Sequence, residues 1–277
     1  MPTFQTSDCK LYYEDDGEGP PIVFIHGLWL TSRFFQKQIE HYARSHRVIV
    51  PDLRGHGRSE KVLSGHTVPQ QTRDLRQLID GLGLTDVILV GWSSGAFCIW
   101  EWINQHGCDN LRAAVIIDES PADFNWPDWI LGAHSLQTLT AMMEMVQHDH
   151  KDLVTNFFVN MLFKQPPTPE DAVWMIDEIT MIPPAIAGVV AFDELTRDYR
   201  DTLANVDVPT LVCFGEHDQF LPQENGPYLV DAMPSARLVT FANSGHAPFY
   251  EEPDRFNSEL DAFVRSLSRP GPVRDVG

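Results

Sequence analysis

The sequence has few positively charged residues and no long apolar run. Of its 277 residues, 20 are Lys or Arg and 39 are Asp or Glu, which gives a formal net charge of −19. Such a charge repels phosphate backbones and anionic membrane surfaces, so neither nucleic acid nor a membrane is expected as a partner. No apolar stretch approaches the roughly 20 residues that span a bilayer, and the first residues lack the features of a signal peptide. We therefore expect a soluble, cytoplasmic protein.

The sequence also lacks a recognisable metal-binding pattern. Its four cysteines (Cys9, Cys98, Cys108 and Cys213) form no CxxC pair, and each lies in or beside an apolar run. Small buried hydrophobic side chains are therefore their expected role. The segment His148-Asp149-His150 is interpreted as a polar turn. No metal and no cofactor are expected.

Short apolar and β-branched runs alternate along the chain with amphipathic stretches, which is typical of a parallel α/β sheet. The runs are continuous, as expected of strands that are buried on both faces. Helices are expected over 72–82 and 96–105. The predicted strands cover residues 22–25, 47–50, 87–90, 114–117, 210–214 and 237–241.

One stretch of about ninety residues, from 118 to 210, has no clear strand and is rich in Met, Phe and Trp. Apolar residues at positions i, i+3 and i+4 predict three or four helices there. Open α/β sheets bind ligands at the carboxyl ends of their strands, so we interpret this stretch as a helical cap over that edge. The expected organisation is a core of 1–121 and 206–268, a cap of 122–205 and a disordered tail of 269–277.

Segments that follow predicted strands carry the residues of nucleophilic catalysis. Gly91-Trp-Ser-Ser-Gly95 lies between a strand and a helix, where G-x-S-x-G places a nucleophilic serine on a sharp turn. Serine needs a base and a carboxylate that orients the base. We therefore predict Ser93 as nucleophile, His246 as base and Asp218 as acid. Asp118, which ends the preceding strand, is the alternative acid.

These motifs resemble those of the α/β-hydrolase superfamily, in its capped branch. The similarity covers about 20–121 and 207–263, and it extends to Phe24-Ile-His-Gly27 and to Pro51-Asp-Leu-Arg-Gly-His-Gly-Arg-Ser59. It implies a mostly parallel central sheet flanked by helices, with a helical cap inserted between the sixth and seventh strands. Within the superfamily, the motifs look most like those of small serine esterases and cofactor-free haloperoxidases.

The same resemblance implies an oxyanion hole made of two backbone N–H groups, those of Leu28 and Ser94. The Leu28 side chain is expected to line the pocket beside Trp29. His26 and His56 are expected to brace loops rather than to act in catalysis.

Four tryptophans are candidates for the substrate pocket, with ordinary core packing as the alternative. An aromatic-lined pocket would favour a hydrophobic or aromatic acyl group. The other histidines, including His134 and His150, are expected to be solvated surface residues. The candidate tryptophans are Trp29, Trp92, Trp126 and Trp129.

The leading functional hypothesis is hydrolysis of a carboxylic ester or lactone of a small hydrophobic or aromatic substrate through an acyl-enzyme. Serine at the nucleophile position argues against haloalkane dehalogenases and epoxide hydrolases, which carry aspartate there. One alternative is a cofactor-independent dioxygenase of a hydroxyquinolone-type substrate that uses a His246–Asp dyad, although those relatives have histidine where this chain has Ser94. The other alternative is a ligand receptor with a vestigial triad. The oligomeric state cannot be read from the sequence.

Overall fold

The computed structural model describes residues 2–267, so the predicted tail of 269–277 lies outside the described residues. An eight-stranded sheet in the order β1-β2-β4-β3-β5-β6-β7-β8 forms the centre of the fold. β1 and β2 pair antiparallel, as do β2 and β4, and all other neighbours are parallel. The strands are β1 Thr3–Gln5, β2 Lys10–Asp16, β3 Pro21–Ile25, β4 Arg47–Pro51, β5 Val87–Trp92, β6 Leu111–Ile117, β7 Thr210–Gly215 and β8 Ala236–Phe241.

All six predicted strands are present, as β3 to β8. The two strands that the sequence analysis missed, β1 and β2, form the antiparallel edge of the sheet. In β2 only Leu11, Tyr12 and Tyr13 are buried, and charged residues stand on both sides of them. A strand this near the edge of the sheet has no long continuous apolar run, because neighbouring elements cover only part of it.

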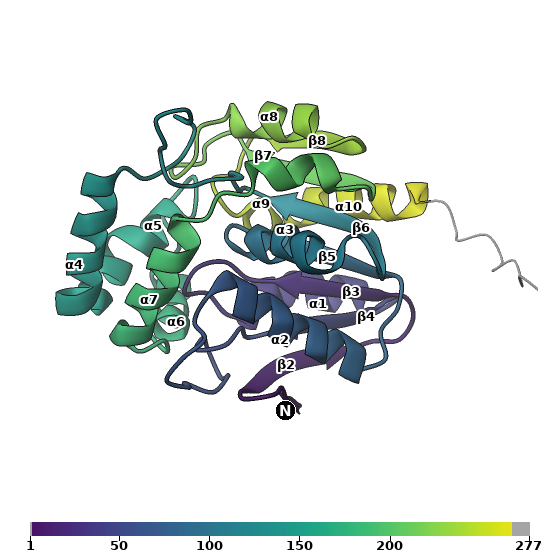
Figure 1. Cartoon of the computed structure of the whole chain (residues 1–277), viewed down its shortest axis with the longest axis horizontal. Helices are drawn as coiled ribbons and strands as arrows, with labels where there is room; N and C mark the ends of the chain where they lie inside the picture. The colour runs from purple at the N-terminus through teal and green to yellow at the C-terminus, as the bar shows by residue number, and fades with distance from the viewer. Residues whose placement is uncertain (1, 268–277) are drawn as a thin grey trace, which may run out of the picture.

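Helices cover both faces of the sheet (Figure 1), and the predicted helices 72–82 and 96–105 correspond to α2 and α3. Two apolar clusters fill the spaces between the sheet and its two helical layers. One layer consists of α2 Val68–Gly81, α3 Gly95–His106 and α8 Asn225–Ala232. The other consists of a 3-10 turn, Ser32–Phe35, and of α1 Gln36–Tyr42, α9 Pro248–Glu251 and α10 Pro253–Ser266.

The stretch between β6 and β7, the sixth and seventh strands, is helical as expected. Its helices gather beyond one end of the sheet (Figure 1). Among the described residues no single helix is long and apolar enough to cross a membrane, and α6 and α7 reach that limit only as a pair bent by 88°. The elements are α4 Leu136–Leu153, a π-helical turn Val154–Phe158, α5 Val159–Met161, α6 Pro169–Ile179, α7 Pro184–Leu195 and a 3-10 turn Arg200–Asn205.

The polar turn expected at 148–150 is instead part of α4. Asp149 has non-helical dihedral angles (φ −156°, ψ 51°), which kink the helix, and the π-helical turn follows. His150 is buried, with its ring 5.0 Å from that of Trp29. The predicted turn is therefore wrong, and so is the solvated position expected for His150, because the cap folds this side chain onto the core; His148 is exposed as expected.

A buried carboxylate joins the cap to the core. Glu178 on α6 accepts hydrogen bonds from both terminal nitrogens of Arg58, at 2.9 and 2.7 Å. The Thr31 hydroxyl donates to the same carboxylate at 2.7 Å. These contacts hold α6 against the two loops that follow β3 and β4, so the cap has a defined position above them.

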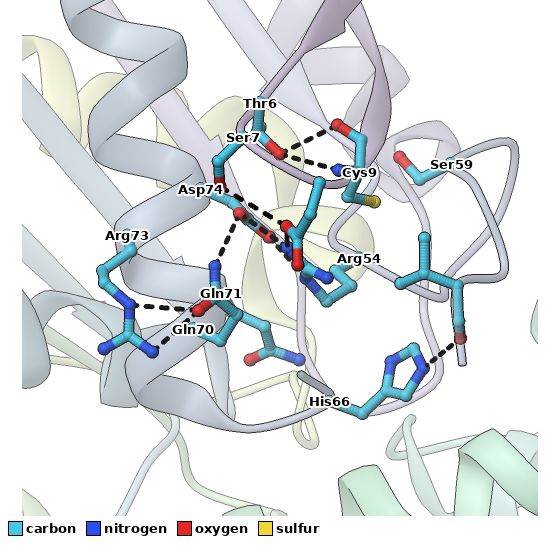
Figure 2. Close-up of polar contacts among 12 residues, drawn as sticks. Thr6, Ser7, Cys9, Arg54, Ser59, His66, Gln70, Gln71, Arg73 and Asp74 are labelled. Atoms are coloured by element: carbon cyan, nitrogen blue, oxygen red, sulfur yellow. Dashed lines mark hydrogen bonds and ion pairs between the residues drawn. The ribbon is translucent and has the colours of Figure 1, made fainter. Parts of the chain in front are cut away.

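A second buried ion pair fixes the loop after β4 to α2 (Figure 2). The Arg54 side chain is fully buried, and its guanidinium donates to both carboxylate oxygens of Asp74, at 2.7 and 2.9 Å. A second carboxylate, that of Asp8, also contacts Arg54 but is half exposed. Asp74 is thus the only fully buried counter-charge to Arg54 among the described residues.

We expect Asp74→Asn to reduce the free energy of unfolding by about 3 kcal/mol, because it leaves the buried Arg54 without its main counter-charge. Asp80→Asn is the matched control on the same helix, since Asp80 forms an exposed pair with Arg76 and such pairs contribute less than about 1 kcal/mol. Urea unfolding of both variants measures the difference. Equal, small losses would mean that Asp8 alone can neutralise Arg54.

Candidate active site

Ser93 lies on a tight turn between β5 and α3. Its φ is +54°, in the left-handed region that non-glycine residues rarely adopt. The Ser93 N–H donates to the carbonyl of Ile117 at 2.8 Å. A Cβ atom at Gly95 would lie 2.3 Å from the Ile25 carbonyl oxygen, and one at Gly91 would lie 2.6 Å from the backbone of α3. The two glycines therefore allow the helix to approach the sheet closely enough to form the turn.

Asp218 and His246 follow the neighbouring strands β7 and β8 and contact one another. His246 Nδ1 lies 2.9 Å from Asp218 Oδ2, and both side chains are buried. The other carboxylate oxygen of Asp218 accepts the N–H of Phe220 at 2.7 Å. This pairing assigns the Nδ1–H tautomer to a neutral His246 and leaves its Nε2 free to act as a base.

Ser93 and His246 line the same cavity. Among the described residues no hydrogen bond joins the Ser93 hydroxyl to His246. Catalytic hydrogen bonds of this kind often form fully only when substrate is bound.

The alternative acid, Asp118, lies behind Asp218. It follows β6 with a φ of +42°, and its two oxygens lie 3.0 and 3.2 Å from the N–H of Gly215. Complete burial and the charge of Asp218 raise the pKa of Asp118 well above its ordinary value. A protonated Asp118 donates a hydrogen bond to Asp218, so the two candidate acids stand in series and only Asp218 pairs with His246.

Ligand atoms of Asp118, Asp218 and His246 lie within 4.8 Å of one another, a spacing at which they could hold a metal ion. In the structure these atoms are instead joined in a hydrogen-bonded chain. Of the four cysteines, three are buried as predicted and Cys108 is half-buried.

His26 braces the loop that follows β3. Its Nδ1–H donates to the carbonyl of Gly27 at 2.8 Å, and its Nε2 accepts the N–H of Leu53 at 3.0 Å. Burial lowers the pKa of His26, which keeps the imidazole neutral. The expected bracing role is confirmed for His26, and His56 similarly contacts the Arg54 carbonyl at 3.0 Å.

The loop braced by His26 packs directly on the Ser93 turn. A Cβ atom at Gly27 would lie only 2.8 Å from the Ser93 Cβ. The backbone N–H groups of Leu28 and Ser94 donate no hydrogen bond within residues 2–267, and both residues line the cavity. They are therefore available to a ligand oxygen, as an oxyanion hole requires.

The cavity lies between the sheet edge and the cap. Its walls are mostly apolar, which suits a small hydrophobic ligand. Phe158, from the π-helical turn, and Phe220 also line an adjoining cavity nearer the surface. The apolar walls include Leu28, Leu30, Met142, Phe158, Leu162 and Phe220.

The structure places Trp92 and Trp29 away from this cavity. Trp92 is buried beneath the Ser93 turn, and its indole N–H donates to the His246 carbonyl at 2.7 Å. Trp29 lines only the adjoining cavity, and its N–H donates to the Ala187 carbonyl at 3.0 Å. A buried indole needs a hydrogen-bond acceptor, and both rings reach one in the protein backbone.

Trp126 and Trp129 do not line the cavity either. They form an isolated β-bridge with each other at the start of the cap. The Trp129 ring packs against Tyr228, and its N–H donates to the Ala122 carbonyl at 2.7 Å. The apolar part of the lining thus comes from aliphatic, Met and Phe side chains, and the expected tryptophan lining of this cavity is wrong.

The sequence analysis missed three polar residues that line the cavity: Glu119, Asp123 and His134. Glu119 directly follows β6, at the sheet edge where functional side chains gather, so its position was a usable signal. Asp123 and His134 enter through the path of the cap, which local sequence patterns do not reveal. The solvated position expected for His134 is wrong, because its side chain is half-buried in the cavity wall, and this burial lowers its pKa.

Glu194, at the end of α7, is buried beside Ser94. Burial raises the pKa of Glu194 to about 8, although hydrogen bonding to Ser94 and Gln71 favours its ionised form. Its Oε2 atom has no hydrogen-bond partner among the described residues. The side chain therefore stays protonated at neutral pH.

Comparison with known proteins shows which protein family the chain resembles. Residues 22–259 match the model of the "Alpha/beta hydrolase family". The chain belongs to this family. The match includes β3 to β8 and every catalytic candidate, so the family and its fold are as the sequence motifs suggested.

Known relatives extend the match over nearly the whole chain. A protein named non-heme chloroperoxidase CPO-A1, from Kitasatospora aureofaciens, is 31% identical over 95% of this chain and 99% of its own length. The AB hydrolase superfamily protein YisY of Bacillus subtilis is 30% identical over 92% of this chain and 96% of its own length. The solved structure of an esterase from Exiguobacterium antarcticum superposes with a TM-score of 0.91. It is 25% identical in sequence, and the match covers 95% of this chain and 99% of the esterase chain. These relatives support a hydrolase enzyme.

We expect Glu194→Gln to stabilise the protein more at pH 8 than at pH 5. Between the ordinary pKa of 4.5 and the folded value of about 8, only the unfolded chain loses this proton, so stability falls as pH rises. Glutamine has no proton to lose, so the variant avoids this decrease in stability. The free energy of unfolding that it gains over the wild type should therefore be larger at pH 8 than at pH 5 by on the order of 3 kcal/mol.

Urea unfolding at both pH values measures the gain, with Glu170→Gln on the exposed face of α6 as control. The control should show no pH-dependent gain. An equal gain at pH 5 and pH 8 for Glu194→Gln would contradict a protonated Glu194.

Proposed function

We propose that the protein is a serine hydrolase that cleaves a carboxylic ester or lactone of a small hydrophobic substrate through an acyl-enzyme. One observation carries the proposal: His246 Nδ1 lies 2.9 Å from the buried Asp218 carboxylate, in the same site as a serine on a strained turn. A serine of this kind needs such a base and such a carboxylate to become a nucleophile.

In the proposed reaction, the Ser93 hydroxyl attacks the substrate carbonyl carbon while His246 Nε2 accepts its proton. Asp218 stabilises the imidazolium that forms. The negative charge on the former carbonyl oxygen is bound by the N–H groups of Leu28 and Ser94, which have no acceptor of their own among the described residues. His246 then gives its proton to the leaving alcohol, and the acyl group remains on Ser93.

The second half of the proposed reaction repeats these steps with water. His246 removes a proton from a water molecule, which attacks the acyl carbon, and the acid leaves as Ser93 recovers its proton. For a lactone the alcohol and the acid are parts of one molecule, so the product is a single hydroxy acid.

Asp118 has a positioning role in this proposal. Its pKa is raised by burial and by Asp218, so it donates a hydrogen bond and adds no second charge beside Asp218. The Gly215 N–H fixes the Asp118 carboxyl from the other side. Asp118 thus orients the Asp218 carboxylate toward His246.

The cavity supports a small hydrophobic acyl or alcohol group. Its mostly apolar walls suit such a group. Phe158 stands at the boundary with the adjoining cavity, with its ring 5.2 Å from Trp29 and 5.8 Å from Phe220. This aromatic boundary favours short acyl chains.

Hydrolysis of p-nitrophenyl esters from acetate to decanoate tests the proposal. We expect turnover by the wild type, with a preference for the shorter esters, and a loss of about 10⁴-fold or more in kcat for Ser93→Ala. Ser235→Ala, at an exposed position, is the control and should keep wild-type activity.

Retention of most activity by Ser93→Ala would overturn the proposed acyl-enzyme. Oxygen consumption with a hydroxyquinolone-type substrate, independent of Ser93, would favour the dioxygenase alternative instead.

The two acids should respond differently to the same substitution. Asp118→Asn keeps an acceptor for Gly215 and a donor for Asp218, so we expect kcat to fall by less than about tenfold. Asp218→Asn removes the charge that stabilises the imidazolium and should lower kcat by about 10⁴-fold. Steady-state kinetics on the preferred ester measures both. The reverse order would assign the acid role to Asp118.

A further inference from the structure

A second carboxyl pair lies in the cavity and has no part in the proposed proton transfers. Glu119 and Asp123 line the cavity together with Ser93 and His246. Both side chains are more than nine-tenths buried, at 1% and 6% exposure. Burying carboxyl groups in an apolar cavity is costly unless they have hydrogen-bond partners or a function.

Asp123 has few hydrogen-bond partners among the described residues. Glu119 Oε1 accepts the N–H of Ser120 at 2.6 Å, which fixes the Glu119 carboxyl. Asp123 Oδ1 has no hydrogen-bond partner among the described residues unless Glu119 carries a proton and donates to it. The second oxygen of Asp123 accepts no hydrogen bond within residues 2–267, so it is open to a ligand.

No cationic side chain offsets this pair. None of the residues that line the cavity is Lys or Arg. The titratable groups that act on Asp123 are Glu119, His246 and Asp218, and Glu194 is also close enough to respond to its charge. Burial raises the pKa of Asp123 to about 6, and burial together with the neighbouring Asp123 raises the pKa of Glu119 well above its ordinary value.

We propose that the Glu119–Asp123 pair binds an O–H or N–H donor that the substrate carries close to its scissile carbonyl. The pair offers an acceptor oxygen in the same cavity as the proposed nucleophile, between walls that are mostly apolar. A hydroxyl or an ammonium group would supply the hydrogen bond that the protein leaves unmade, and a carboxylate there would be repelled. This inference rests on the proposed hydrolysis, and it selects hydroxy or amino esters and lactones within that class.

The test compares four ethyl esters of similar size in a pH-stat at pH 7.5. Ethyl butyrate is the reference, ethyl 3-hydroxybutyrate and ethyl 3-aminobutyrate carry the two donors, and monoethyl succinate carries a negative charge. The measured quantity is kcat/KM for each ester relative to ethyl butyrate, in the wild type and in two variants. Asp123→Leu removes the acceptor, and Asp123→Asn removes only the charge.

We expect the wild type to prefer the donor-bearing esters and to discriminate against monoethyl succinate. Asp123→Leu should lower the relative kcat/KM of the hydroxy and amino esters about tenfold or more, because a site built around a hydrogen bond discriminates strongly. Asp123→Asn should lower the value for the amino ester and raise that for monoethyl succinate. If Asp123→Leu lowers the relative kcat/KM of the amino ester alone, the donor that the pair binds is an ammonium group. If it lowers the values of both esters, the pair also binds a hydroxyl group.

Asp177→Asn, on the exposed side of α6, is the control and should leave every ratio unchanged. Unchanged ratios in both Asp123 variants, with ethyl butyrate still hydrolysed, would overturn this inference and leave the proposed function intact. Absence of Ser93-dependent hydrolysis of any of the four esters would overturn the proposed function itself. The gain expected for monoethyl succinate cannot result from a loss of folding.

Discussion

The left-handed backbone of Ser93 is the constraint on which the rest of the site depends. A φ of +54° is strained for serine, and it persists because the surrounding structure holds the turn on every side. The hydrogen bond to Ile117 ties the turn to β6, and the close contact of Gly95 with the Ile25 carbonyl ties it to β3. Since β5 lies between these two strands, the turn cannot relax without moving the centre of the sheet.

The same parallel sheet assembles the rest of the site. The strands β3, β5, β6, β7 and β8 are consecutive neighbours, and each is followed by a residue of the proposed machinery. Because parallel strands end at one edge, side chains more than two hundred residues apart in sequence meet there. Leu28, Ser93, Asp118, Asp218 and His246 follow these strands in that order. The cap closes this edge, and the Glu178 contacts with Thr31 and Arg58 hold it there.

Most of the strands and the catalytic candidates could be predicted because short segments of sequence determine them. The residues that line the cavity could not, because the path of the cap determines them. Strands β3 to β8 were predictable because they are buried on both faces and read as continuous apolar runs, and the G-x-S-x-G motif located the strained turn. The pairing of Asp218 with His246 followed from their places after two strands. The tryptophans were wrongly predicted to line the pocket, because a large apolar side chain suits a core as well as a pocket. Only the path of the chain determines which of the two positions each side chain takes. Asp123 and Phe158 enter the cavity through that path, so no local pattern could place them there.

The raised pKa values around the site bear on how an acidic protein can support the proposed chemistry. The tetrahedral intermediate is an anion, and a cavity rich in ionised carboxylates would oppose its formation. Burial instead raises the pKa values of Asp118, Glu119 and Glu194, which favours their uncharged, hydrogen-bonding forms. Burial raises the pKa of Asp123 to about 6, and the hydrogen bond with Glu119 opposes that shift. In the proposed reaction an imidazolium forms on His246 at the moment the oxyanion forms, and it offsets Asp123 as well as Asp218. The net charge of −19 is therefore compatible with an anionic transition state, because burial keeps most of the carboxyl groups at the site neutral.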